Sequence, residues 1–225
     1  MYLSRIELNA KRRTTMKALA MPQLLHGAIE SGFPGERRRN LWRIDWLNNH
    51  CYLLVLSDTK PDLTGVADQF GFPNVEPLWE TKNYDSLLEQ IAAGQVWGFR
   101  LRANPVHAVK DKGAPGRGRL FAHVTPEQQK TWLLARSEKL GFSLEDNAFE
   151  VVHTEWKKFR KGQDGGREVS LRTASFEGVL TVTDAELFRE ALTKGVGRGK
   201  AYGLGMLTVI KPHSIKVQND NNPRN

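Results

Sequence analysis

The stretch LWRIDWLNNHCYLLVLSD, residues 41–58, decides the fold of the first half of this 225-residue chain. Its two apolar segments, residues 41–47 and 51–58, have the length and composition of β-strands. Between them lie Asn48, Asn49 and His50, residues typical of a tight turn. We therefore expect two neighbouring strands here, joined by a turn.

The segments on both sides of this strand pair complete a six-element unit. Proline favours the first position of a helix, and glycine favours the position just past its end. The predicted elements are a strand over residues 1–8, a helix over 22–33 from Pro22 to near Gly32, a helix over 61–71 entered through Pro61, and an irregular strand over 75–84. The resulting order is strand, helix, strand, strand, helix, strand.

A helical link over residues 84–94 leads to a second unit with the same order. Its predicted elements are a strand over 96–105, a helix over 125–141 capped by Thr125, strands within 151–160 and 167–184, a helix over 184–195 capped by Asp184, and a strand over 202–211. The repeated order predicts an α+β fold of two tandem ferredoxin-like (RRM-like) domains. We place the domains at residues 1–84 and 85–213, followed by a polar, disordered tail at 214–225.

Composition narrows the class of protein. Forty per cent of the residues are hydrophobic, and no apolar run approaches the roughly 20 residues of a membrane helix. The first residues do not have the pattern of a secretory signal, so we expect a cytoplasmic protein without membrane contact. The single cysteine, Cys51, excludes an intrachain disulfide and fits a small buried hydrophobe better than a nucleophile.

The net charge of +8 is concentrated in three clusters, at residues 11–13, 37–39 and 156–162. Clustered cations indicate a polyanionic partner, and nucleic acid is favoured over a membrane surface because no long basic amphipathic helix is evident. In the third cluster, Lys157, Lys158, Arg160 and Lys161 lie where a strand approaches a turn. A solvated basic edge that prevents aggregation is one explanation; a basic hairpin that binds structured RNA suits the crowding better.

A second basic segment, GVGRGKAYGLG, occupies residues 195–205. The dinucleotide motif GxGxxG fails in every register, and the P-loop fails because Ala201 follows Lys200. Both motifs also lie between a strand and the following helix, whereas this loop leaves a helix and enters a strand. Two interpretations stay open: the loop approaches RNA phosphates with Arg198 and Lys200, or its glycines allow tight packing between the domains.

His26 is the candidate catalytic residue. The sequence has no metal-ligand motif, and we expect neither a metal nor another cofactor. The other histidines are dispersed, but His26 shares the polar face of its predicted helix with Gln23 and Glu30 and lies just before the triple-arginine cluster. An imidazole beside cations is a suitable acid or base for RNA cleavage by the ribose 2′-hydroxyl.

The segments MYLSRIEL, LLHG, LWRID, FRLRANP, FEGVLTV and GVGRGKAYGLGMLTV together resemble the CasE family, the CRISPR-associated endoribonucleases of type I-E systems. The resemblance extends in order to about Pro212. It implies a metal-independent ribonuclease that cuts precursor CRISPR RNA at the 3′ base of each repeat hairpin, leaving a cyclic phosphate. It further implies that the protein holds the product and joins the other subunits of the Cascade complex, which serves antiviral defence.

The resemblance also assigns roles to residues. His26 falls on the family's catalytic histidine, the run from Lys157 to Lys161 on a hairpin that enters the RNA groove, and Arg100 and Arg102 on the arginines of the RxRANP strand. The family's frequent second catalytic tyrosine is replaced by Gln23, which can orient a phosphate oxygen by hydrogen bonding but cannot donate a proton of comparable acidity. Ser31 or one of Arg37, Arg38 and Arg39 could assist instead. The alternative is a non-catalytic subunit that only binds the RNA hairpin.

Overall fold

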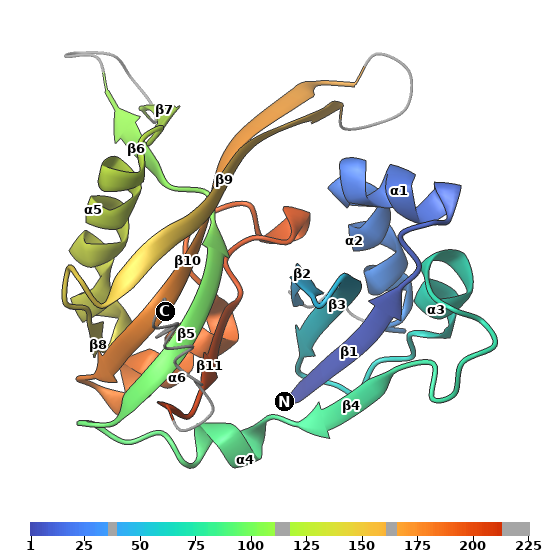
Figure 1. Ribbon diagram of the computed structural model, residues 1–225, viewed down its shortest axis with the longest axis horizontal. Coiled ribbons are helices and arrows are strands. Elements are labelled where there is room, and N and C mark those ends of the chain that lie inside the picture. Colours follow the sequence, from blue (N-terminus) through green and yellow to red (C-terminus); the bar gives the residue numbers. More distant parts are fainter. Residues whose placement is uncertain (36–39, 111–117, 161–165, 213–225) are drawn as a thin grey trace, which may run out of the picture.

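A computed structural model describes residues 1–35, 40–110, 118–160 and 166–212 of the chain. It contains two antiparallel sheets, each with helices packed on one face, and the two sheets lie side by side in Figure 1. The α+β fold of two tandem ferredoxin-like units is confirmed. Within the described residues, no helix is both long and apolar enough to cross a membrane.

The first sheet has the strand order β2-β3-β1-β4. Neighbouring strands are all antiparallel, as the ferredoxin-like order requires. Its elements are β1 (Tyr2–Leu8), α1 (Arg13–Ala20), α2 (Pro22–Ser31), β2 (Leu41–Leu47), β3 (His50–Ser57), α3 (Thr64–Phe70) and β4 (Glu80–Asn83). Helix α1 was not predicted; only its first residue, Arg13, had been noted, as the end of the cation cluster at residues 11–13.

The predicted hairpin at residues 41–58 is confirmed, except that His50, predicted to lie in the turn, belongs to β3. Leu47 pairs with His50, so Asn48 and Asn49 form a two-residue turn. Both have positive φ, 50° and 65°, a conformation that asparagine tolerates better than most residues and that matches the twist of paired strands.

The second sheet has the order β11-β5-β10-β8, and β9 also pairs with β10. Its elements are α4 (Asp85–Leu88), β5 (Val96–Ala103), α5 (Pro126–Ser137), η1 (Glu138–Leu140), β8 (Phe142–Ser143), β9 (Phe149–Arg160), β10 (Glu168–Val182), α6 (Ala185–Lys194), η2 (Lys200–Tyr202) and β11 (Leu207–Ile210). A separate, unpredicted hairpin consists of β6 (Val106–Val109) and β7 (Arg119–Ala122).

Helix caps were predictable from the sequence, but two element boundaries were not. Thr125 caps α5 in a reciprocal capping box, and the Asp184 side chain accepts hydrogen bonds from two backbone amides of α6. Helix α3 begins at Thr64, three residues after Pro61. The strand predicted to start at residue 202 begins only at Leu207, because the glycines before it adopt positive φ.

The two sheets share part of one hydrophobic core. Helices α1, α2 and α3 cover one face of the first sheet, over a core that includes Ile6, Leu25 and Leu53. On the opposite face, Leu41 and Leu56 join the core of the second sheet, whose members include Leu101 and Phe176. The first unit therefore packs directly on the second.

A buried arginine connects the two units next to this core. Arg43 of β2 is 2% exposed and pairs through both Nε and Nη2 with the carboxylate of Asp45, at 2.7 Å each. Its Nη1 donates to the carbonyls of Arg100 and Met206 at 3.0 Å each, and Nη2 also donates to Thr208 Oγ1 at 2.9 Å. A buried charge with this set of partners fixes the position of β2 against β5 and β11.

Candidate RNA-binding and cleavage site

Helix α2 carries the candidate catalytic histidine on its partly exposed face. Pro22 starts the helix, and Leu25 and Ile29 are buried against the first sheet. His26 follows Leu25 in the helix, and its side chain is 38% exposed. Its Nδ1 lies 3.9 Å from Glu30 Oε1. Asn40 donates to the same Glu30 oxygen at 3.3 Å. The carboxylate therefore lies behind the imidazole, whose opposite side is available to a ligand.

Gln23, one helical turn before His26, contacts the second unit. Its Nε2 donates to the main-chain carbonyl of Arg160 at 2.6 Å, at the end of β9. Its Oε1 is buried and has no hydrogen-bond partner. The Ser31 hydroxyl donates to Ala28 of its own helix at 2.8 Å, so it is engaged locally. Gln23 thus joins the helix of His26 to the basic hairpin of β9 and β10.

The cations of β9 fall on two different faces of the strand. Side chains alternate along a strand, so Lys158 and Arg160, which are exposed, lie on the face opposite to Lys157. Lys157 is 23% exposed and has Nζ 3.7 Å from Glu155 Oε1. Burial, together with the nearby charge of Arg102, lowers the pKa of Lys157, although Glu155 acts in the opposite direction. The predicted basic run therefore separates into outward and inward groups.

The arginines of β5 are already paired with carboxylates. Arg100 binds Glu177 at 2.8 Å and approaches Asp45 at 3.8 Å, and Arg102 binds Glu155. Both line a cleft of about 450 Å³ between β2, β5 and β9, together with Lys157. A ligand that contacted these arginines would compete with the carboxylates that now hold them.

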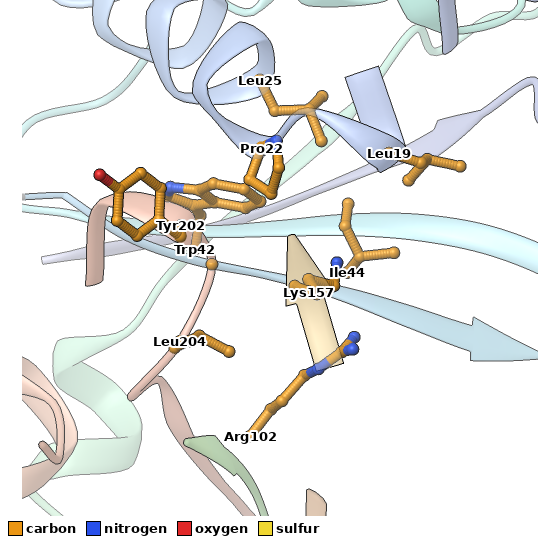
Figure 2. A pocket seen from close by; sticks show the side chains of 10 residues that line it. Leu19, Pro22, Leu25, Trp42, Ile44, Arg102, Lys157, Tyr202 and Leu204 are labelled. Carbon is orange, nitrogen blue, oxygen red and sulfur yellow. The ribbon is translucent and has the colours of Figure 1, made fainter. Parts of the chain in front are cut away.

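The glycine-rich loop, residues 195–205, packs against both units. A Cβ on Gly203 would lie 2.6 Å from the Trp42 ring, and one on Gly197 would lie 3.2 Å from Trp132 of α5. Figure 2 shows Tyr202 and Trp42 close to Pro22 of α2, around a cavity of about 10 Å³, enough for one water molecule. Tyr202 also packs edge to face with Phe159 of β9, at 4.9 Å between centroids.

These contacts support the packing interpretation of the loop, since its glycines allow close approach between the two units. They do not exclude the other interpretation, because Arg198 is exposed at the loop's outer surface. Lys200 is half-buried and lies in the turn η2, which contacts α2. The loop therefore packs against helix α2, and its exposed Arg198 is accessible to a ligand.

Some predicted residues lie outside the described part of the chain: Arg37, Arg38, Arg39, Lys161 and the tail at 214–225. In the described residues, no group of three or more His, Cys, Asp or Glu side chains could hold a metal ion. Helical spacing had already placed Glu30 on the face of His26, and the structure brings the two side chains to 3.9 Å. Sequence reasoning missed the contact of Gln23 with Arg160, which no local pattern could have revealed.

The assembled site combines an accessible imidazole, a neighbouring basic hairpin and a glycine-rich loop. An imidazole is a suitable acid or base for RNA cleavage, and the exposed cations on the outward face of β9 can hold phosphates. This arrangement suits cleavage of a bound polyanion in which the attacking group belongs to the substrate.

Comparisons with known proteins agree with this chemistry. The family model described as CRISPR associated protein matches residues 1–211. The chain is 32% identical over 222 residues to CRISPR-associated endoribonuclease Cse3 of Thermus thermophilus, covering 93% of this chain and 99% of the relative. It is 29% identical over 167 residues to the CRISPR system Cascade subunit CasE of Escherichia coli K12, covering 71% and 74%. The solved structure of CRISPR endoribonuclease Cse3 bound to a 19-nucleotide RNA matches with a TM-score of 0.74 and 29% identity, covering 92% of this chain and 98% of that one.

Proposed function

We propose, from the premise that this chain belongs to the CRISPR associated protein family, that it is an endoribonuclease that processes precursor CRISPR RNA. It cleaves at the 3′ base of the repeat hairpin and does not need a metal ion. The observation that carries this proposal is the hydrogen bond from Gln23 to Arg160, which holds the helix of His26 against the basic hairpin. An RNA held by that hairpin reaches the imidazole where it crosses from the outward face of β9 to α2.

The 2′-hydroxyl upstream of the scissile phosphate is the nucleophile in this mechanism. Its oxygen forms a bond to phosphorus as its proton is removed, and the bond from phosphorus to the 5′ oxygen breaks as that oxygen gains a proton. The products are a 2′,3′-cyclic phosphate and a 5′-hydroxyl. His26 transfers one of these two protons, and the carboxylate of Glu30, 3.9 Å from Nδ1, adds a negative charge beside the ring.

RNA binding falls to the outward cations. We assign Lys158, Arg160 and Arg198 to direct phosphate contact, because they are exposed. Arg100, Arg102 and Lys157 instead form the charged lining of the cleft, where Glu155 and Glu177 hold them. Roles for Arg37, Arg38, Arg39 and Lys161 stay predictions from the sequence.

The protein holds its cleaved RNA hairpin and joins the other Cascade subunits with it, since a relative is named as a Cascade subunit. The proposed domain boundary at residues 84 and 85 falls between β4 and α4. We also propose a cytoplasmic location, where the precursor RNA is made.

Cleavage of a labelled repeat RNA in EDTA tests the function. We expect a product ending in a cyclic phosphate for the wild type, none for His26→Ala with hairpin affinity retained, and none when the attacking ribose is replaced by deoxyribose. His50→Ala, which removes another exposed histidine of the same unit, should cleave normally. Binding without a product from the wild type would favour the alternative, a non-catalytic hairpin-binding subunit.

A further inference from the structure

An exposed tryptophan lies in the middle of the basic hairpin. Trp156 of β9 is 49% exposed, far more than the buried Trp42, Trp97 and Trp132. Trp156 shares its strand face with Lys158 and Arg160 and points away from the face of Lys157, which is directed toward α2. The packing of the protein does not account for an indole in this position.

A fixed guanidinium supports the indole. Arg172 is the cross-strand partner of Trp156, and its Cζ lies 5.8 Å from the ring centroid. Its Nη2 donates to Thr154 Oγ1 at 2.6 Å and to the carbonyl of Val124 at 3.2 Å. Arg172 Nε is buried and has no hydrogen-bond partner. The indole therefore has a positioned guanidinium beside one part of the ring and keeps the rest of its surface exposed.

The charges around Trp156 favour a polyanion. Lys158 and Arg160 follow at two-residue steps of roughly 6.6 Å, a spacing comparable to that of phosphates along an extended nucleic-acid strand. Glu168 lies opposite Arg160 in the strand pair and is the acidic residue of this face within the described part of the hairpin. An aromatic ring in a row of cations is the usual composition of a surface that binds single-stranded nucleic acid.

We propose that Trp156 is a stacking site for an unpaired nucleobase of the bound RNA, with Lys158 and Arg160 on the adjoining phosphates. This inference rests on the proposed function and adds a subsite to it. The base is unpaired because bases inside a duplex have no free face for an indole. Since Trp156 faces away from α2, the stacked base lies off the scissile side and contributes to affinity, not to the chemical step.

Equilibrium binding and single-turnover cleavage of the repeat RNA, measured on full-length protein, test this subsite. Trp156→Ala should weaken binding about fivefold to a hundredfold, the range for loss of one stacked base, with an unchanged salt slope. The cleavage rate at saturating RNA should stay at the wild-type value. Trp156→Phe keeps a π-face and should bind within about threefold of the wild type.

Phe121→Ala is the matched control, because Phe121 is 45% exposed on β7, outside both the basic hairpin and the charged cleft; its affinity should not change. Abasic replacement of one unpaired nucleotide at a time should identify one position at which Trp156→Ala has no further effect. Equal affinity of Trp156→Ala and wild type, or the same loss in Phe121→Ala, would overturn the stacking site. Wild-type protein that neither binds nor cleaves the RNA would overturn the proposed function instead.

Discussion

The side-chain amide of Gln23 donates a hydrogen bond of 2.6 Å to the main-chain carbonyl of Arg160, 137 residues further along the chain. The donor lies on the helix of His26, and the acceptor lies at the end of the strand that carries the outward cations. Gln23 thus connects the helix of His26 directly to the basic hairpin of β9 and β10.

Loss of this connection should slow cleavage more than it weakens binding. A net hydrogen bond contributes about 0.5–1.5 kcal/mol, so we expect Gln23→Leu to reduce the single-turnover rate roughly twofold to tenfold at saturating RNA. Gln23→Glu cannot donate to the carbonyl and should behave like Gln23→Leu. In a His26→Ala background neither change should matter. A rate for Gln23→Leu equal to that of the wild type would show that the contact does not position His26.

The two adjacent lysines of β9 should respond differently to the loss of their positive charge. Lys158→Glu removes an outward cation and should lower the slope of log affinity against log salt by roughly 0.7–0.9 for one phosphate. Lys157→Met removes a half-buried cation whose pKa is lowered by burial, so it should leave that slope unchanged and not reduce the free energy of unfolding. The slopes are measured by RNA titration between low and moderate salt. Identical slopes for both variants would contradict the division of the hairpin into two faces.

Arg43 should be the most sensitive charged position for stability. Arg43→Met leaves Asp45 and two main-chain carbonyls without their partner, and we expect a loss of about 3–5 kcal/mol in the free energy of unfolding. The control is Arg5→Met, which breaks the half-exposed pair with Glu80 and should cost less than about 1 kcal/mol. Urea denaturation measures both. Equal effects would mean that Arg43 does not join the two units.

Gly203 should not tolerate a side chain. Its φ is +75°, and a Cβ would lie 2.6 Å from the ring of Trp42, so Gly203→Ala combines backbone strain with a clash. We expect a loss of at least about 1 kcal/mol in the free energy of unfolding. Gly65→Ala, in α3 with no atom within 4 Å of the new Cβ, should instead be neutral or stabilising. Thermal unfolding distinguishes the two; a stabilised Gly203→Ala would contradict the packed loop.

Cys51 should be unreactive in the folded protein. Burial, followed in effect by the charges of Asp45 and Glu7, raises the pKa of its thiol to about 11 from 9.0. The folded state therefore favours the neutral thiol. The burial of the neutral Cys51 thiol contributes to stability below pH 9, and this contribution is lost as the pH rises toward 11. A thiol reagent at pH 8 should label the unfolded chain in urea quickly and the native protein very slowly. Rapid labelling of native protein would show that the site is open.

The order of elements was predictable because it depends on local signals. Pro22, Thr125 and Asp184 mark helix starts through backbone geometry that a few neighbouring residues determine, and the Asn48–Asn49 turn fixes the register of β2 and β3. His26 was predicted as a candidate in the same way, since helical spacing places it on the polar face of its helix. The repeated order then left the tandem ferredoxin-like fold as the expectation.

Only the tertiary structure decided which of the charged side chains are exposed to solvent. The sequence presents Lys157 and Lys158 as equivalent, but strand alternation and the approach of Glu155 and Arg102 make one half-buried and leave the other exposed. In the same way, the sequence shows Gly197 and Gly203 only as loop residues. The structure shows that each packs against a tryptophan ring, Trp132 and Trp42 respectively. Such contacts join residues far apart in the chain. The composition of the sequence therefore predicted a polyanionic partner, and the packing of the two units decided which cationic side chains are exposed.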